Sequence, residues 1–201
     1  MMILRSAPAS PFGRKVKMAA HIVGVIDRIK IVNADTLSAE DDLRQQNPLG
    51  KIPTLILDDG RVLYDSRVIV DYIDHLGGGG RVIPVKSPDR FDVLVMQALA
   101  DGIMDAAILQ IYELRFRSED RREPKWVSHQ AGKVERALAA LEAHPPHLSP
   151  VPHIGTVAVA CALGYLDFRF EGAWRKQHPR LVAWLDDFAA RVPSFAATAP
   201  H

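Results

Sequence analysis

The sequence predicts a chain of two parts: an α/β domain with a mixed four-stranded sheet and helices packed on it, then an all-helical domain. Three observations lead to this fold class. Strand-like and helix-like segments alternate up to residue 76, four glycines follow at 77–80, and the later segments have the apolar spacing of helices. A glycine run with prolines nearby is typical of a linker. We therefore assign residues 1–77 to the first domain, 78–87 to the linker and 88–201 to the second domain.

Apolar periodicity and turn residues place the elements of the first domain. Strands are expected at 2–5, 29–32, 54–57 and 62–64, and helices at 11–23, 39–46 and 66–76. The first helix has one apolar face, which leaves Arg14, Lys15 and Lys17 for water, and Gly24 is expected to end it. The first three strands need crossover connections, whereas the turn at 58–60 joins the last two as a hairpin, so the sheet should be mixed.

Helices account for the second domain. Ser87 and Pro88 supply a cap and a first-turn residue for the first of these helices, and Pro124 starts the second. The apolar patterns run over 88–114, 124–141, 156–170 and 181–188. The third pattern is nearly all apolar, so we expect that helix to be buried on most sides.

Composition excludes two classes of partner. With 25 Lys and Arg against 24 Asp and Glu in 201 residues, the net charge is +1, without the basic surplus that nucleic-acid binding needs. The longest apolar run, 157–166, is well short of the roughly 20 residues of a membrane-spanning helix. No signal peptide is visible. We therefore expect a soluble, cytoplasmic protein with no nucleic-acid or membrane partner.

Cysteine and histidine usage argues against a disulfide or a metal site. Cys161 is the single cysteine, which excludes an intramolecular disulfide and a multi-cysteine metal site. Its apolar helical surroundings indicate an inert core residue. His144, His147 and His153 lie in a proline-rich loop without an acidic or cysteine partner, so no metal is expected.

Ser10 lies between the first strand and the first helix and has two interpretations. In the structural one it caps the helix, with Pro11 in the first turn. In the functional one the helix N-terminus attracts a ligand thiolate, and the Ser10 hydroxyl donates to it and lowers its pKa. A drop of two units corresponds to about 2.7 kcal/mol. Ser6 is a less favoured hydroxyl because it falls at the strand end rather than at the helix start.

Two further motifs have the same double interpretation. Pro53 is tolerated as the first residue of a strand, but a cis proline would expose the N–H and C=O of Ile52 to a bound peptide, with Lys51 near a carboxylate. Asp65 and Ser66 either cap a helix or bind a ligand, Ser66 holding a carboxylate and Asp65 an ammonium group.

The order and spacing of these motifs resemble the cytosolic glutathione S-transferase superfamily, and its bacterial serine-type (Ser-Pro-Phe) subgroup in particular. The motifs that carry the resemblance are residues 10–12 with 14–16, 47–53, 65–66, 99–105 and 160–166. The resemblance covers nearly the whole chain. It implies a thioredoxin-like N-terminal domain, an all-helical C-terminal domain, a homodimer and a role in detoxification.

The same resemblance implies a glutathione transferase, which activates the glutathione thiol for attack on a hydrophobic electrophile. Ser10 would be the catalytic residue that holds the thiolate. The residues implied to bind glutathione, the co-substrate, are Phe12, Lys51, Ile52, Pro53, Asp65 and Ser66. Ile52 would pair with the cysteinyl part, Asp65 and Ser66 with the γ-glutamyl end, and Lys51 with the glycyl carboxylate.

Other residues keep open interpretations. Met104, Ile108 and Tyr112 line either the electrophile pocket or the core. Asp101 and Asp105, which share a helix face, are solvated, bound to a neighbouring element, or part of the ligand site.

The chain also departs from the family pattern. Relatives begin the buried C-terminal helix with Ser/Thr-x-x-Asp, whereas here Thr156 is followed by Val159, which cannot return the hydrogen bond; Thr156 is still expected to cap the helix. Serine at position 10 excludes the mixed disulfides of cysteine-type relatives, although disulfide chemistry through bound glutathione stays open. The alternative function is a non-catalytic protein of this fold that binds a ligand or a protein partner.

Overall fold

A computed structural model describes residues 1–86 and 89–200. The first part contains β1 (Met2–Ser6), α1 (Pro11–Val23), a 3₁₀ turn (Ile26–Arg28), β2 (Ile29–Asn33), α2 (Leu43–Gln46), β3 (Thr54–Ile56), β4 (Val62–Leu63) and α3 (Ser66–Leu76). The second part contains α4 (Asp89–Phe116), α5 (Pro124–Ala143), α6 (Ile154–Phe170), α7 (Pro179–Arg191) and α8 (Ser194–Ala197), with 3₁₀ turns at Glu119–Arg121 and Ala173–Lys176. This order confirms the predicted fold class.

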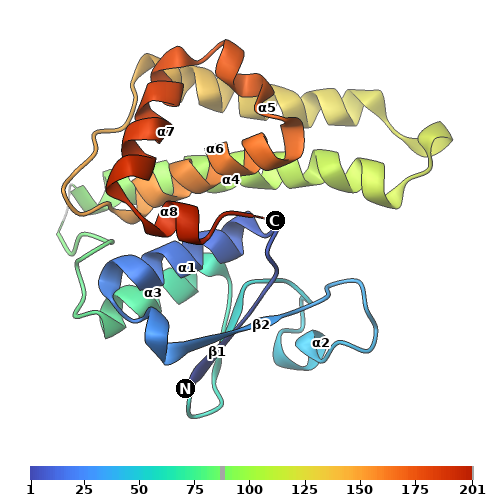
Figure 1. Cartoon of the computed structure of the whole chain (residues 1–201). Coiled ribbons are helices and arrows are strands. Elements are labelled where there is room, and N and C mark those ends of the chain that lie inside the picture. Colours follow the sequence, from blue (N-terminus) through green and yellow to red (C-terminus); the bar gives the residue numbers. More distant parts are fainter. Residues whose placement is uncertain (87–88, 201) are drawn as a thin grey trace.

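The strands form one mixed sheet in the order β2-β1-β3-β4. β1 runs parallel to β2 and antiparallel to β3, and β3 and β4 form the expected hairpin. Leu4 and Leu55 at the centre of the sheet are fully buried. Helices α1 and α3 pack side by side between the sheet and the helical region (Figure 1). Helix α1 is therefore in contact with both parts of the chain.

Helix α1 is buried more completely than its sequence predicts. Ser10 caps it, and Gly24 ends it in the left-handed conformation at φ 79°, as expected. The expectation that Arg14, Lys15 and Lys17 face water is wrong: Arg14 and Lys15 are buried, and Lys17 is half-buried. The reason is that α6 packs on the side of α1 away from the sheet.

By length and composition alone, helix α4 could span a membrane. The sequence analysis did not identify this helix as a candidate. It has 28 residues, and its most apolar 18-residue window has a mean hydropathy of 1.4 and is 39% buried. In this fold it packs against α5 and α6. Ser87 and Pro88, the predicted start of this helix, lie outside the described residues.

Helix α6 begins two residues earlier than predicted. Its cap is His153, whose Nδ1 accepts from the backbone N–H of Thr156 (3.3 Å), while the Thr156 hydroxyl donates to the His153 carbonyl (2.8 Å). The expectation that Thr156 is the cap is therefore wrong. Two hydrogen bonds thus link positions 153 and 156, but they are not a capping box, because the Thr156 hydroxyl donates to the His153 carbonyl and does not accept from the His153 N–H.

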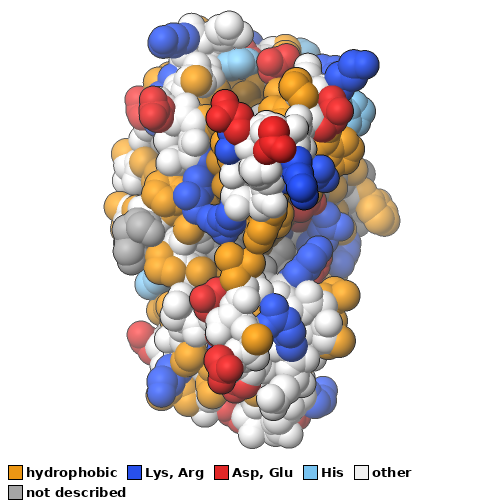
Figure 2. Space-filling model, turned by 90° about the vertical axis from the view of Figure 1, so that its right-hand side faces the viewer, with side chains coloured by type: hydrophobic (Ala, Val, Ile, Leu, Met, Phe, Trp, Pro, Cys, Tyr) orange, Lys and Arg blue, Asp and Glu red, His pale blue; other side chains and the backbone are white. Residues whose placement is uncertain are grey.

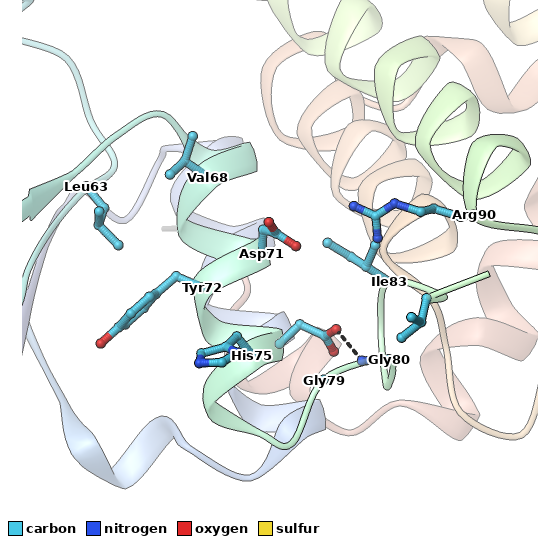
Figure 3. Close-up of a pocket in the computed structure, with 11 residues that line it drawn as sticks. Leu63, Val68, Asp71, Tyr72, His75, Gly79, Gly80, Ile83 and Arg90 are labelled. Carbon is cyan, nitrogen blue, oxygen red and sulfur yellow. Dashed lines mark hydrogen bonds between the residues drawn. The ribbon is translucent and has the colours of Figure 1, made fainter. Parts of the chain in front are cut away.

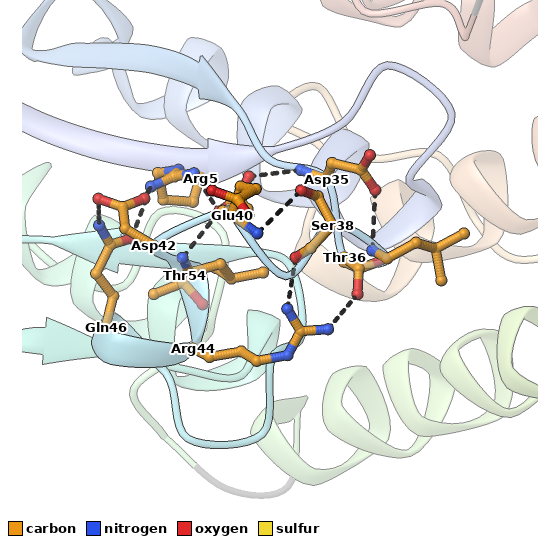
Figure 4. A network of polar contacts seen from close by, with 12 residues as sticks. Arg5, Asp35, Thr36, Ser38, Glu40, Asp42, Arg44, Gln46 and Thr54 are labelled. Carbon is orange, nitrogen blue, oxygen red and sulfur yellow. Dashed lines mark hydrogen bonds and ion pairs between the residues drawn. The ribbon is translucent and has the colours of Figure 1, made fainter.

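A polar network holds the loop between β2 and α2 against the sheet (Figure 4). Arg5 of β1 donates to Asp41 (2.7 Å), Asp42 and Gln46 (2.9 Å). Arg44 donates to the carbonyls of residues 36 and 38 at 3.0 and 2.6 Å. Because α2 leads directly into the turn at 47–53, this network fixes the approach to the second predicted motif.

Candidate functional site

The sheet topology brings the three predicted motifs to one end of the first domain. Arg5, near the end of β1, pairs with Thr54 at the start of β3, and β4 runs antiparallel to β3. The end of β1, the start of β3 and the end of β4 therefore lie at the same edge. Helices α1 and α3 start from that edge, and the turn at 50–53 precedes β3 there.

Ser10 is half-buried at the start of α1, where its Oγ accepts a hydrogen bond from the backbone N–H of Gly13 at 3.1 Å. A hydroxyl that accepts keeps its own proton for donation to an anion. Ser10 also lines a small crevice with Arg14, Tyr165 and Pro200. Its position is therefore compatible with both the capping role and the predicted thiolate contact.

The other candidate hydroxyl, Ser6, is buried, and its Oγ has no hydrogen-bond partner among the described residues. It packs against Gly13, where a side-chain Cβ would lie only 2.0 Å from this oxygen. Glycine at position 13 thus allows β1 and α1 to approach closely. Phe12 on the same helix is half-buried, and Lys15 Nζ lies 5.6 Å from the centre of its ring.

The peptide bond between Ile52 and Pro53 is cis, as the motif suggested. The Lys51 carbonyl accepts from Asn47 Nδ2 (3.0 Å) and from the Thr54 hydroxyl (2.9 Å), which fixes the turn. The N–H and C=O of Ile52 have no partner within the part of the chain that the structure describes. The Lys51 side chain is exposed. This turn therefore offers a free backbone donor, a free backbone acceptor and a cation.

Asp65 and Ser66 mark the start of α3. Asp65 is exposed and caps the helix, with Oδ1 accepting from the N–H of Arg67 at 3.0 Å, whereas Ser66 is buried. The helix N-terminus carries a partial positive charge. A ligand here would meet an acid on the surface and backbone N–H groups behind it.

A buried ion network, which the sequence analysis missed, ties the two helix starts together. Asp101 of α4 accepts from Lys15 Nζ of α1 at 2.6 Å and from Arg67 Nε of α3 at 3.0 Å. Burial lowers the pKa of Lys15, and Asp101 opposes that shift. The hydrogen bond to Asp101 raises the pKa of Arg67. The one sequence signal for this network was Asp101, an acidic residue within the apolar face of α4.

Three interpretations were left open for Asp101, and the structure supports the one in which it bonds to neighbouring elements. Asp105, one turn further along, is exposed; partial desolvation, followed by the charge of Asp101, raises its pKa. Of the other residues left open, Met104 is core, Ile108 is half-buried against the core, and Tyr112 is exposed.

Comparison with known proteins shows the family of this chain. The chain matches the glutathione S-transferase N-terminal domain over residues 9–76 and the C-terminal domain over residues 124–187. It is 31% identical to the uncharacterized GST-like protein YibF of Escherichia coli K12, over 99% of this chain and 98% of that protein.

The chain belongs to the glutathione S-transferase family.

Solved structures of the family share the fold over the full length of both chains. A glutathione transferase family member from Pseudomonas fluorescens Pf-5, crystallised with bound glutathione, has a TM-score of 0.91 and 44% identity. A second structure, with bound S-(propanoic acid)-glutathione, has a TM-score of 0.88 and 43% identity. A glutathione S-transferase from Methylobacillus flagellatus KT with bound glutathione has a TM-score of 0.92 and 35% identity.

Within this glutathione S-transferase fold, the cysteine is remote from solvent. Cys161 is fully buried with Sγ 3.6 Å from Sδ of Met18, and burial raises its pKa to about 11. The prediction of an inert core thiol is therefore confirmed. Among the described residues no group of three or more His, Cys, Asp or Glu side chains is arranged to hold a metal ion.

A cavity of about 470 Å³ lies away from the predicted site (Figure 3). It lies between the outer face of α3 and the segment leading to α4, lined by Leu63, Val68, Tyr72 and His75 among others. Asp74 shapes its floor by accepting from the N–H groups of residues 80–82 at 2.8 to 3.0 Å. No predicted glutathione-binding residue lines it.

Proposed function

We propose that this chain is a serine-type glutathione transferase. It binds glutathione along the edge where α1, the turn at 50–53 and α3 meet, and it presents the ionised sulfur to a hydrophobic electrophile. The observation that carries the proposal is the convergence of the three motifs, held together by the Lys15–Asp101–Arg67 network.

Each part of glutathione has a chemically suitable partner. Ser10 and the N–H groups at the start of α1 would stabilise the thiolate, because a helix N-terminus favours an anion. Ile52 would pair its unpartnered backbone groups with the cysteinyl residue, as an added strand does. Asp65 and Ser66 would hold the γ-glutamyl end, and the exposed Lys51 the glycyl carboxylate.

Pro53 and Phe12 would act through shape. The buried Pro53 directly precedes β3, next to Ile52, and the half-buried Phe12 ring has its centre 5.6 Å from Lys15 Nζ. The relatives from Pseudomonas fluorescens Pf-5 and Methylobacillus flagellatus KT, solved with bound glutathione, support the proposal that this chain binds glutathione.

The thiol of enzyme-bound glutathione tests the proposal. Its ultraviolet absorbance against pH should show a pKa below that of free glutathione. Ser10→Ala should raise that pKa by about one to two units and slow turnover about tenfold or more, because the thiolate loses a hydrogen bond. Ser6→Ala is the matched control and should leave both quantities unchanged, since the Ser6 hydroxyl is buried without a partner.

A bound thiol that titrates at its free value would contradict the proposal. Retention on immobilised glutathione without turnover of any electrophile would instead favour the non-catalytic alternative. Turnover of glutathione-dependent disulfide reduction, but not of electrophiles, would assign the chemistry to the bound thiol acting as a reductant.

We also propose a homodimer. Phe91, Val95 and Leu99 lie one turn apart on an outer face of α4 and are 62%, 69% and 37% exposed, and Val68 of α3 is also exposed. Such an apolar face is typical of a subunit contact. Sedimentation should give twice the mass of 22.2 kDa, and Phe91→Lys should give monomers, whereas Leu37→Lys, in a loop, should not.

The remaining assignments follow from this chemistry. Use of reduced glutathione requires a reducing compartment, which supports a cytoplasmic location and a detoxification role. We propose that the domains are residues 1–77 and 88–201, joined by 78–87, since α3 ends at Leu76 and α4 is described from Asp89. Separate expression of the two pieces, each monitored for cooperative unfolding, tests the boundary.

A further inference from the structure

We propose that the electrophile of this transferase carries a carboxylate, which Arg115 of α4 and Arg169 of α6 bind beside Ser10. This inference rests on the proposed function and names the substrate class of the same site.

The two arginines lie near the C-terminal ends of α4 and α6. Tyr165 of α6 lines the same crevice as Ser10, and Arg169 follows Tyr165 by one helical turn. The start of α1 and the C-terminal ends of α4 and α6 lie on the same side of the molecule (Figure 1). A group extending from a sulfur at Ser10 would therefore lie beside Tyr165, on the side of the molecule where α4 and α6 end.

Both guanidinium groups are available for an anion. Arg169 Nε is buried without a hydrogen-bond partner, and no carboxylate lies within ion-pair distance of Arg115 or Arg169 across residues 1–86 and 89–200. Their neighbours differ: Arg117 pairs with Glu113 at 3.2 Å, and Arg175 pairs with Asp167 at 2.7 Å. Glu113 and Asp167 thus neutralise Arg117 and Arg175. They leave Arg115 and Arg169 without an acidic partner among the described residues.

Tyr165 lies beside Arg169, whose Cζ is 6.0 Å from the centre of the Tyr165 ring. Burial raises the pKa of Tyr165, while the positive charges of Arg169 and Arg115 oppose that shift and the neighbouring Tyr112 adds to it. Arg169 is therefore placed beside the Tyr165 ring, and Arg115 lies near the end of α4, the helix that packs along α6. A ligand carboxylate near the Tyr165 hydroxyl would receive charge-assisted hydrogen bonds.

Aromatic rings lie beside both arginines. Arg115 Cζ lies 6.0 Å from the centre of the Tyr112 ring, and Arg169 Cζ lies 4.4 Å from that of Phe168. Rings stacked by arginines hold planar, apolar bodies and fix the direction of the guanidinium groups. Figure 2, which views this side, shows Lys and Arg side chains gathered around the middle of the face beside a band of apolar atoms.

The chemistry is a displacement at carbon. The glutathione proton leaves to solvent, the thiolate sulfur forms a bond to the electrophilic carbon, and the bond from that carbon to a leaving group such as chloride breaks. The bonding electron pair departs with the chloride. The carboxylate takes no part in these bonds, so the arginines act by positioning the electrophile against the sulfur.

Two product analogues separate charge from shape. S-(4-carboxybenzyl)glutathione and its neutral isostere S-(4-carbamoylbenzyl)glutathione are titrated calorimetrically into the full-length protein, with glutathione itself measured in parallel. The wild-type protein should bind the carboxylate about tenfold more tightly than the amide, the usual size of one charge-assisted hydrogen bond.

Variants assign the effect to the two arginines. Arg115→Gln and Arg169→Gln should each bring the ratio of the two dissociation constants toward one, with glutathione affinity unchanged. Arg115 is exposed, so its replacement leaves the packing intact. Arg191→Gln is the matched control, because it removes the same charge from α7, where Arg191 pairs with Asp187, and it should keep the tenfold ratio.

Equal affinity of the wild-type protein for the two analogues overturns the inference and leaves the proposed function standing, provided glutathione binds. A tenfold ratio that persists in both arginine variants overturns the assignment to Arg115 and Arg169. Absence of binding by all three compounds overturns the proposed function, and the inference fails with it.

Discussion

Lys15 and Arg5 are both cations that the fold withdraws from water, but their acidic partners differ in exposure. Lys15 is 0% exposed and its partner Asp101 is 1% exposed, whereas Arg5 bonds Asp41 and Asp42, which are 12% and 57% exposed. The first network joins three helices across the two domains, and the second fastens a loop to the sheet. Lys15 is therefore part of a closed contact, one between the two domains that excludes water. Arg5 belongs to a clamp between the loop and the sheet, where water can compete for the hydrogen bonds.

The largest expected effect comes from breaking the closed contact on its acidic side. Asp101→Leu leaves Lys15 charged, buried and without a partner, which should destabilise the protein by about 3–5 kcal/mol. Urea denaturation followed by circular dichroism measures the loss. The double variant Lys15→Met/Asp101→Leu should recover most of it, because an apolar pair of similar volume needs no counter-charge. A loss below about 1 kcal/mol would put Lys15 and Asp101 in the same class as the loop clamp.

A smaller effect should follow from opening the clamp. Arg5→Met keeps the apolar stem in β1 but removes the hydrogen bonds to Asp41, Asp42 and Gln46, at a cost of about 1–2 kcal/mol. Amide exchange should speed up mainly over residues 35–46, whereas Asp101→Leu should speed it up throughout. Uniform acceleration in Arg5→Met would show that the loop and the sheet unfold together.

Acid should open the same loop without a substitution. The backbone N–H groups of Asp35 and Leu43, followed by Arg5, lower the pKa of Asp41 below its ordinary 3.8. A lowered carboxyl pKa contributes stability above 3.8 that is lost as pH falls through the folded value. Amide chemical shifts of residues 35 and 43 should therefore change as the pH falls below 3.8.

His153, the cap of α6, is a group whose neutral form the fold favours. Burial, followed by the charge of His147, lowers the pKa of His153 from 6.5. The unfolded chain then takes up a proton that the folded chain resists, so stability should fall as pH drops below 6.5 and be constant above it. His153→Ser keeps a cap acceptor that does not titrate, and it should remove that slope. Unfolding free energies at about pH 7.5 and about pH 5.5 measure the difference.

The smallest effect should come from a pair open to water on both sides. Arg191 and Asp187 of α7 are both about half-exposed and lie four residues apart. Arg191→Gln should cost about 0.3–0.5 kcal/mol and should lose even that in high salt. A cost comparable with that of Asp101→Leu would remove the distinction between closed and open contacts.

Features set by neighbouring residues were predictable from the sequence. Ser10, Gly24 and the turn before β4 carry local signals for a cap, a helix end and a hairpin, and each lies where expected. The Lys15 contact was not predictable, since Asp101 is 86 residues away and the helix that covers α1 belongs to the other domain. The His153 cap was missed because histidine is uncommon at that position. The availability of Arg115 depends in the same way on which acids pair with its neighbours.

The burial of Cys161 has a practical consequence. It is the only cysteine in the chain, it has no exposed surface, and its sulfur lies 3.6 Å from that of Met18 on the facing helix. A maleimide in excess can reach it only while α1 and α6 stand apart. The rate of labelling would therefore time how often the two halves of the molecule separate, with no introduced probe.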